Sequence, residues 1–152
     1  MDDIDLGILN CLRENSRQTA SMISQTINLS VSAVIERIHK LEAGGVIQKY
    51  TVVLDEKRLG NDLTVFISVR LEHPKYGEDF AAAATAHPNI PECYAIAGDV
   101  DYMLKVVTGS SRSLESIHRE IKEMPGVAWT KTMYVLSTMK NDVSVLPEKS
   151  PG

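Results

Sequence analysis

The chain has little or nothing of the features that mark secreted, membrane and disulfide-stabilised proteins. Its 152 residues include only two cysteines, Cys11 and Cys93, which lie far apart in apolar-patterned segments, so we expect buried free thiols. No run of about 18 apolar residues is present to span a membrane. The sequence opens on Asp2, Asp3 and Asp5 in place of a basic stretch and an apolar signal core, so we expect a cytoplasmic protein with no membrane partner.

The motifs of metal-dependent and phosphate-binding enzymes are also missing. The four histidines are dispersed along the sequence, and neither Cys-x-x-Cys nor His-Glu-x-x-His occurs. No glycine-rich phosphate loop is present. We therefore expect no metal site, no cofactor and no catalytic residue.

Positive charge is scarce as well. The formal net charge of −4 argues against non-specific coating of nucleic acid, because neutralising phosphates requires clustered lysine and arginine. Residues 15–50 are the exception, since they hold four basic and two acidic residues. Any DNA-binding site is therefore expected to be local and to lie in this segment.

Apolar residues recur at helical spacing in three segments of the first half. Residues 4–12 predict a first helix, for which Asp2 or Asp3 is the expected N-cap. Thr19 is the expected N-cap of a short second helix, and Ser30 that of a third. Three helices, the last two joined by a short turn, predict a helix-turn-helix.

The segment after the third helix changes character twice. Gly44-Gly45 ends the helix, and residues 46–54 are rich in β-branched side chains, which predicts a strand that forms the wing of a winged helix-turn-helix. In residues 55–62 the charge rises and the apolar pattern lapses, which predicts a linker. We therefore expect a DNA-binding domain at residues 1–54.

Beyond the linker the pattern predicts a ferredoxin-like βαββαβ unit. Strands are expected at residues 63–71, 90–97, 102–108 and 127–138, and helices at 77–87 and 114–124. The segments 87–90 and 124–127 form a faint internal repeat, because each lies where a helix passes into a strand. The expected fold class is therefore α+β, with an effector and oligomerisation domain at residues 63–140 and a C-terminal tail at 141–152.

A sheet of this kind carries both helices on one face. Strand alternation is expected to place Phe66, Tyr134 and Leu136 on the other face, which makes that face partly apolar. We predict homodimerisation through it, because a small domain with helices on one side gains most by covering its bare side. A solvated face with scattered apolar residues is the alternative.

The third helix carries the pattern expected of DNA recognition. If Val34, Ile38 and Leu41 face the core, the outward residues are Ser32, Ala33, Glu36, Arg37 and Lys40. Small side chains at the helix start let the backbone approach a groove floor, while Arg37 one turn on is placed to contact base edges or phosphates. The alternatives are an ordinary amphipathic helix and a three-helix unit that binds protein.

Residues 95–104, AIAGDVDYML, place two carboxylates beside a glycine within an apolar run. Gly98 and Asp99 suit a tight turn between two strands. A plain turn accounts for one carboxylate more easily than for two, and a metal site or a catalytic pair of Asp99 and Asp101 remains as an alternative. We favour a turn that also presents backbone amides and a carboxylate at a subunit boundary, suited to the two charges of an amino acid.

Over nearly its whole length the sequence resembles the Lrp/AsnC family, the leucine-responsive or feast/famine transcription regulators. The elements that carry the resemblance are Ile4-Asp5-Leu6-Gly7-Ile8-Leu9, Ser16-Arg17, the spacing from Leu29-Ser30 to Arg37, Leu41-Glu42 followed by Gly45-Val46-Ile47, Leu59-Gly60, Gly98-Asp99-Val100-Asp101-Tyr102 and Pro125-Gly126-Val127. Their order along the chain is more specific than any one motif.

The resemblance implies a winged helix-turn-helix that binds double-stranded DNA, and an effector domain that binds an amino acid or a similar small molecule between dimers. It also implies a homodimer that assembles further, to an octamer. The expected DNA contacts are Arg17, Gln18, Ser30, Ser32, Ala33, Glu36, Arg37 and Lys40. The expected effector contacts are Gly98, Asp99, Val100, Asp101, Tyr102, Thr132 and Tyr134.

Two features depart from the family. Val100 stands where the family often has an aromatic residue, which is expected to widen or reshape the effector pocket. The helix-turn-helix is only mildly basic, which implies that several modules of one oligomer share the binding of DNA.

The predicted function is therefore that of a sequence-specific DNA-binding transcription regulator whose assembly or DNA affinity responds to a small metabolite. We expect this metabolite to be an amino acid. The alternative is a decarboxylase-type enzyme of tetrapyrrole synthesis on the same two-domain plan. Such an enzyme would use Asp99 and Asp101 as an acid/base pair, but the sequence indicates neither a perturbed pKa nor a substrate cleft.

Overall fold

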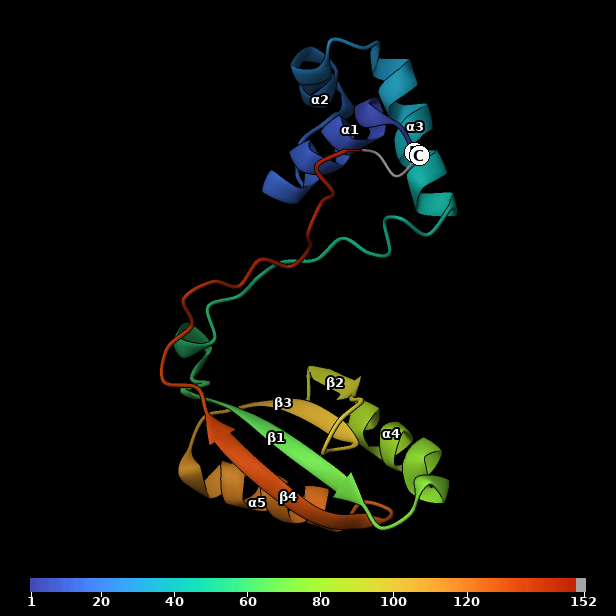
Figure 1. Cartoon of the computed structure of the whole chain (residues 1–152). Helices are drawn as coiled ribbons and strands as arrows, with labels where there is room; N and C mark the ends of the chain where they lie inside the picture. The colour runs from blue at the N-terminus through green and yellow to red at the C-terminus, as the bar shows by residue number, and fades with distance from the viewer. Residues whose placement is uncertain (150–152) are drawn as a thin grey trace. The chain divides into compact units, whose positions relative to one another are not determined.

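The computed structural model describes residues 1–149, which form two compact units (Figure 1). The first unit holds residues 1–53 and the described part of the C-terminal tail from residue 140 onward, and the second holds residues 54–139. The expected tail at 141–152 is described as far as residue 149, and its residues 150–152 lie outside the described part. None of the described helices is both long and apolar enough to cross a membrane.

Three helices make up the first unit, and each begins at a capping residue. They are α1 (Asp3–Glu14), α2 (Ala20–Ile27) and α3 (Val31–Ala43). Asp2 caps α1 in a reciprocal capping box with Asp5, while Thr19 and Ser30 accept hydrogen bonds from the backbones of α2 and α3. The predicted N-caps are confirmed, with Asp2 and not Asp3 at α1.

The turn between α2 and α3 depends on Asn28. This residue adopts the left-handed conformation, with a φ of 53°, which asparagine tolerates better than most other residues. The sharp turn brings the apolar sides of the helices together, and Ile8, Ile23 and Val34 are fully buried at the centre. The first unit therefore contains the expected helix-turn-helix.

The predicted wing strand at residues 46–54 is not present in the described chain. Instead, the amides of Val46 and Ile47 both donate to the carbonyl of Leu41, and the following segment is extended with exposed side chains. The β-branched residues of this segment favour extended backbone, but a strand also needs a neighbour to receive its hydrogen bonds. The prediction of a wing was therefore wrong for the single chain.

The second unit has the order βαββαβ, with all strand pairs antiparallel and the sheet order β2-β3-β1-β4. Its main elements are β1 (Leu63–Leu71), α4 (Gly77–Ala86), β2 (Glu92–Ala95), β3 (Tyr102–Thr108), α5 (Ser111–Lys122) and β4 (Val127–Tyr134), with short 3-10 helices η1 (Lys57–Leu59) and η2 (Pro74–Tyr76). The α+β fold class is thus confirmed. The strands β2 and β4 are shorter than predicted, and η1 lies in the segment expected to be a linker.

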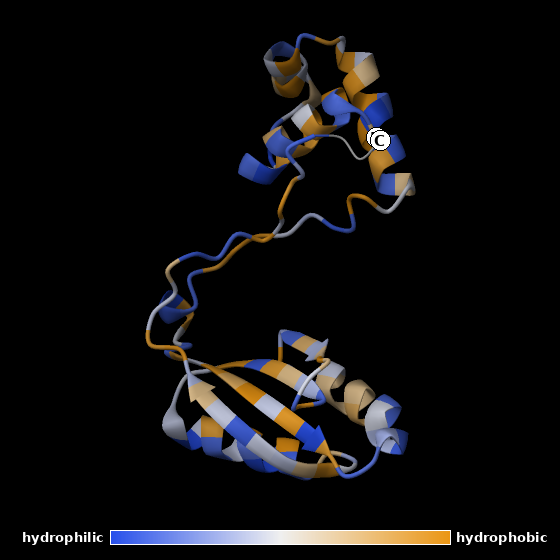
Figure 2. Ribbon diagram, in the orientation of Figure 1, coloured by the Kyte–Doolittle hydropathy of each residue, from blue (hydrophilic) through white to orange (hydrophobic). Residues whose placement is uncertain are grey.

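Both helices cover the same face of the sheet. Val65, Ile67 and Val69 of β1 are fully buried in one cluster with side chains of α4 and α5, among them Phe80 and Ile121. Hydropathy alternates along the strands accordingly (Figure 2). This layer is the core of the second unit.

The opposite face of the sheet is covered by no helix. Strand pairing brings together on it Phe66, Tyr94, Met103, Trp129 and Met133, which we call the open sheet face. A salt bridge of 3.1 Å between Lys105 and Glu92 crosses the same face. The expectation of a partly apolar bare face is therefore confirmed, although for a different set of residues.

Tyr134 and Leu136 do not belong to this face. Tyr134 pairs with Val65, so it lies on the face that the helices cover, and Leu136 follows the end of β4. Alternation along one strand gives two sets of residues, but only the register with the neighbouring strand tells which set faces the core. The prediction that Tyr134 and Leu136 share the open face with Phe66 was therefore wrong.

Gly126 is the last residue of the turn before β4 and has a φ of 72°, and a Cβ atom at this position would overlap the side chain of Tyr76. We expect Gly126→Ala to lower the free energy of unfolding by about 3 kcal/mol, because left-handed strain and overpacking add. Gly60→Ala is the matched control, since Gly60 has a φ of 81° and open space around it, and we expect a loss of about 1 kcal/mol. Urea unfolding followed by the fluorescence of Trp129, the only tryptophan, measures both. Equal losses would show that Tyr76 imposes no constraint.

Candidate DNA-binding surface and effector loop

Helix α3 presents a polar side to solvent, because its apolar residues follow one stripe. Val34 and Leu41 are buried against α1 and α2. Ser32, Glu36 and Lys40 lie on the exposed side, so three of the predicted DNA contacts have the accessibility that this role requires.

Glu36 and Lys40 of α3 are paired with each other one turn apart. The distance between Glu36 Oε1 and Lys40 Nζ is 2.7 Å, and the two side chains are 68% and 74% exposed. The hydrogen bond from Lys40 holds the pKa of Glu36 below its ordinary value. A pair this exposed contributes little stability, so Lys40 can exchange this partner for a phosphate at small cost.

Arg37 is not free at the surface, which corrects the prediction that it faces outward. Its Nη1 atom lies 2.9 and 2.8 Å from the two carboxylate oxygens of Asp2 and 2.7 Å from Oδ1 of Asp5. The hydrogen bonds with Asp5 and Asp2 raise the pKa of Arg37 above its ordinary value. The sequence contained the signal, because Arg37 follows Val34 by three positions and precedes Leu41 by four, which places it at the border of the buried stripe.

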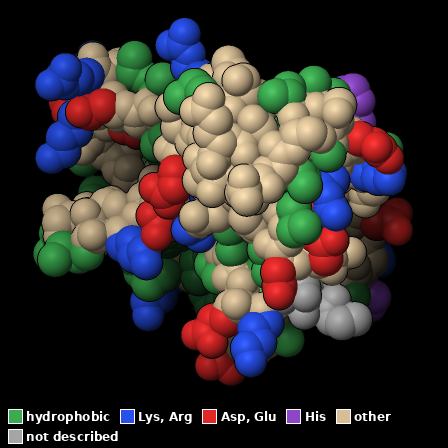
Figure 3. All heavy atoms as spheres, turned by 90° about the horizontal axis from the view of Figure 1, so that it is seen from above, with side chains coloured by type: hydrophobic (Ala, Val, Ile, Leu, Met, Phe, Trp, Pro, Cys, Tyr) green, Lys and Arg blue, Asp and Glu red, His purple; other side chains and the backbone are tan. Residues whose placement is uncertain are grey.

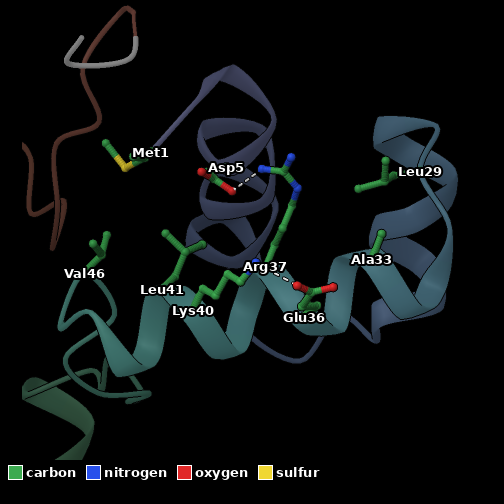
Figure 4. A pocket seen from close by; sticks show the side chains of 9 residues that line it. All are labelled: Met1, Asp5, Leu29, Ala33, Glu36, Arg37, Lys40, Leu41 and Val46. Atoms are coloured by element: carbon green, nitrogen blue, oxygen red, sulfur yellow. Dashed lines mark hydrogen bonds and ion pairs between the residues drawn. The ribbon is translucent and has the colours of Figure 1, made fainter.

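A hollow of about 510 Å³ lies beside this cluster, between the start of α1 and α3 (Figure 4). Its lining consists of Met1, Asp5, Leu29, Ala33, Glu36, Arg37, Lys40, Leu41 and Val46. The charged groups in the lining are already paired, Asp5 with Arg37 and Glu36 with Lys40. The hollow therefore offers a ligand no unpaired side-chain charge.

The remaining predicted DNA contacts differ in accessibility. Gln18 is partly buried and donates from Nε2 to the carbonyl of Cys11, so it fastens the loop before α2 to the end of α1. Ser30 acts as the cap of α3, and Ala33 is half-buried. Arg17 is exposed, and its guanidinium makes no ion pair within residues 1–149. On the face seen in Figure 3, basic side chains lie singly or beside acidic ones, as the mild charge of the sequence led us to expect.

The loop of residues 96–101 connects β2 to β3 and is held at the end of β1. The amide of Asp101 donates to the carbonyl of Val69, and Arg70 donates from Nη1 to the carbonyl of Asp99 at 2.8 Å. Asp101 Oδ2 accepts a hydrogen bond of 2.7 Å from the amide of Leu71, where β1 and β4 shift register. The carboxylate of Asp101 therefore has a structural role at this irregularity.

Asp99 presents the second carboxylate of this loop to solvent. Its side chain is exposed and makes no hydrogen bond or ion pair within the described chain. The amides of residues 98–100 also donate to no acceptor in that part of the molecule. A carboxylate and a row of free N–H groups therefore lie next to each other, a combination that suits a ligand with both charges.

The other predicted effector residues lie on the helix side of the sheet. The hydroxyl of Tyr102 donates to the carbonyl of Gly77, and its ring packs at 4.7 Å from Phe80. Thr132 pairs with Ile67 and is half-buried. Tyr134 pairs with Val65 and thus lies near the opposite end of β1 from the 96–101 loop, so one chain does not bring Tyr134 and this loop together.

Sequence analysis missed three partners of the predicted site residues. Asp2 and Asp5 were expected only at the start of α1, and the sequence gives no sign that Arg70 contacts the 96–101 loop. No group of three or more His, Cys, Asp or Glu side chains among residues 1–149 is arranged to hold a metal ion.

Both units match models of known domains. The AsnC-type helix-turn-helix domain matches residues 1–42, and the Lrp/AsnC ligand binding domain matches residues 64–145. The chain is 36% identical over 149 residues to the HTH-type transcriptional regulator FL11 of Pyrococcus horikoshii, covering 98% of this chain and 97% of that protein. It is 31% identical over 147 residues to the HTH-type transcriptional regulator LrpA of Mycobacterium tuberculosis, covering 97% of each.

Solved structures of similar regulators superpose on nearly the whole chain. The complex of the Neisseria meningitidis transcriptional regulator NMB0573 with L-Met has a TM-score of 0.91 at 28% identity, and 96% of each chain is covered. The feast or famine regulatory protein of M. tuberculosis complexed with L-methionine has a TM-score of 0.90 at 31% identity, and covers 96% of this chain and 99% of that one. The chain therefore belongs to the Lrp/AsnC family of transcriptional regulators.

Proposed function

We propose that this transcriptional regulator binds specific DNA sequences through α3 and senses an amino acid at the 96–101 loop. The observation that carries the proposal is the accessible polar side of α3 in a capped helix-turn-helix, within the same chain as an effector domain whose loop has free polar groups. The relatives are transcriptional regulators, and we propose that this chain likewise acts without catalysis and in the cytoplasm.

The DNA contacts we propose divide into two kinds. Ser32, in the first turn of α3, is small and exposed, so the helix start can come close to the base edges in the major groove. Arg17 and Lys40 are exposed cations suited to phosphates. Because so few cations contribute per helix-turn-helix, we propose that several modules of one oligomer bind DNA together.

The effector we propose is an amino acid, because its ammonium suits the Asp99 carboxylate and its carboxylate suits the free amides of residues 98–100. The two similar regulators described above have L-methionine bound, which supports this ligand class. Val100 is half-buried within the loop and is the residue we propose to shape the space for the side chain of the ligand.

We propose a homodimer that buries the open sheet face, since exposed aromatic and methionine side chains gather there on a sheet covered only on its other side. Tyr134 lies far along the sheet from the 96–101 loop, so an effector site that includes both requires a second copy of the chain. We propose that dimers associate further in this way, to an octamer.

Ser32→Glu tests the DNA-binding surface. The new carboxylate faces the groove, while a negative charge in the first turn favours the helix, so folding is preserved. We expect the affinity for a duplex selected from a random pool by the unmodified protein to fall by about 2 kcal/mol, roughly thirtyfold, in a gel shift at fixed salt. Ser111→Glu makes the same change in the first turn of α5 and is expected to leave binding unchanged. Unchanged binding by Ser32→Glu would remove α3 from the interface.

Asp99→Asn tests the effector site. A thermal-shift screen of the twenty standard amino acids, beginning with L-methionine, is expected to find one that stabilises the unmodified protein by mass action. We expect Asp99→Asn to bind that amino acid about tenfold more weakly in calorimetry, because a charge-assisted hydrogen bond is lost. Asp62→Asn is the control, because Asp62 is also exposed and lies outside the 96–101 loop. Equal affinities of the two variants would contradict this site, and a screen without stabilisation would contradict an amino-acid effector.

Trp129→Glu tests the dimer. Trp129 lies on the open sheet face, and a glutamate there would remove the large apolar side chain and bring a charge into the interface. We expect sedimentation velocity to show species of lower mass than for the unmodified protein. Leu59→Glu, at a similarly exposed apolar residue outside the sheet, is expected to sediment like the unmodified protein. If Trp129→Glu also did so, the open sheet face would not be the interface.

A further inference from the structure

Arg37 connects the middle of α3 to the N-terminus of α1. It is the seventh residue of α3, about 9 Å along the axis from Val31 at the usual rise of 1.5 Å per residue. The start of α3 is already fixed by the turn at Asn28 and by the Ser30 cap. The attachment at Arg37 adds a polar contact to the apolar packing of Val34 and Leu41, and so further restricts the angle between α3 and α1.

The cap of α1 and the attachment of Arg37 together use every oxygen of the two carboxylates. Asp2 Oδ1 accepts from the amide of Asp5 and from Arg37, and Asp2 Oδ2 accepts from Arg37. Asp5 Oδ2 accepts from the amide of Asp2, and Asp5 Oδ1 accepts from Arg37. The cap of α1 and the attachment of α3 are therefore one hydrogen-bonded cluster, formed by Asp2, Asp5 and Arg37. Figure 4 shows its contact between Asp5 and Arg37.

Partial burial makes this cluster stronger than the neighbouring pair on α3. The side chains of Asp5 and Arg37 are 14% and 29% exposed, against 68% and 74% for Glu36 and Lys40. Charge-assisted hydrogen bonds gain strength as water is excluded, whereas exposed pairs are screened. Breaking the bonds between Arg37 and the two carboxylates to contact DNA would leave Asp5 partly buried without its counter-ion.

We propose that Arg37 is a positioning residue for DNA recognition, held by Asp2 and Asp5 so that α3 is presented at a fixed angle, and that it contacts no base. This inference rests on the proposed binding of DNA through α3. It assigns base recognition to side chains in the first turns of α3, and it makes two acidic residues at the N-terminus necessary for tight binding of a polyanion.

The direction in which Asp5→Asn changes the DNA affinity distinguishes a positioning role of Arg37 from a general electrostatic effect. Asp5→Asn removes a negative charge near the DNA-binding surface, so electrostatics alone predicts tighter binding. A positioning role predicts weaker binding of DNA, because the neutral side chain of the new asparagine attracts Arg37 less than the carboxylate does, and α3 is then held less firmly against α1. Glu14→Gln is the matched control, since it also removes the carboxylate partner of a cation in the first unit, but from an exposed pair within α1 that holds no second helix.

The test measures the affinity of full-length variants, at fixed salt, for a duplex selected from a random pool by the unmodified protein. We expect Arg37→Gln and Asp5→Asn each to bind roughly tenfold more weakly. The double variant, with both Arg37→Gln and Asp5→Asn, is expected to bind as tightly as the single variant with the lower affinity, because the two changes remove the same interaction. Glu14→Gln is expected to bind as tightly as the unmodified protein or more tightly.

The base preference of each variant, measured as its relative affinity for duplexes that differ at one base pair, does not change when part of the protein is unfolded. We expect Arg37→Gln to keep the same preference at every base pair, with all affinities lowered by one factor, and Arg37→Lys to recover part of the loss. Circular dichroism at the assay temperature checks that each variant is folded. Relaxed preference at one base pair in Arg37→Gln, or undiminished affinity in Asp5→Asn, would overturn the inference. If the unmodified protein selects no duplex, the proposed DNA binding itself fails.

Discussion

The pairing of β1 with both β3 and β4 is the constraint on which the second unit depends. Alternate residues of this central strand divide its two faces, with Val65, Ile67 and Val69 buried beneath the helices and Phe66 on the open sheet face. The strand ends at the register shift near Leu71, where Asp101 accepts a backbone hydrogen bond in place of a regular neighbour. The core, the proposed dimer surface and the proposed effector loop thus all take their positions from β1.

The first unit depends in the same way on its first residues. Three small helices bury a thin core, so polar contacts between helices contribute much of what fixes their angles. Asp2 and Asp5 begin α1 and also hold Arg37, while Gln18 holds the loop before α2 to the end of α1. Acidic residues beside the helix proposed to bind DNA are unfavourable for attracting phosphate, but Arg37 neutralises part of their charge.

Elements and caps were predictable from the sequence because local chemistry determines them. Thr19, Ser30 and the alternation in residues 63–71 gave the helix starts and β1 correctly. The wing strand and the face of Tyr134 were not predictable, because both depend on a neighbouring strand that periodicity does not specify. Of the site residues, Ser32, Lys40 and Asp99 are exposed as expected, whereas Arg37 and Asp101 proved to have partners that are distant in sequence. Gln18 proved to bind the end of the preceding helix.

The position of Met1 has a practical consequence for work with the purified protein. Met1 lines the hollow beside α3, next to the carboxylates that hold Arg37. An affinity tag fused to Met1 places foreign side chains beside the hollow that α3 lines, and a polyhistidine tag adds titratable cations there. DNA affinities measured before such a tag is removed therefore report on the tag as well as on the regulator.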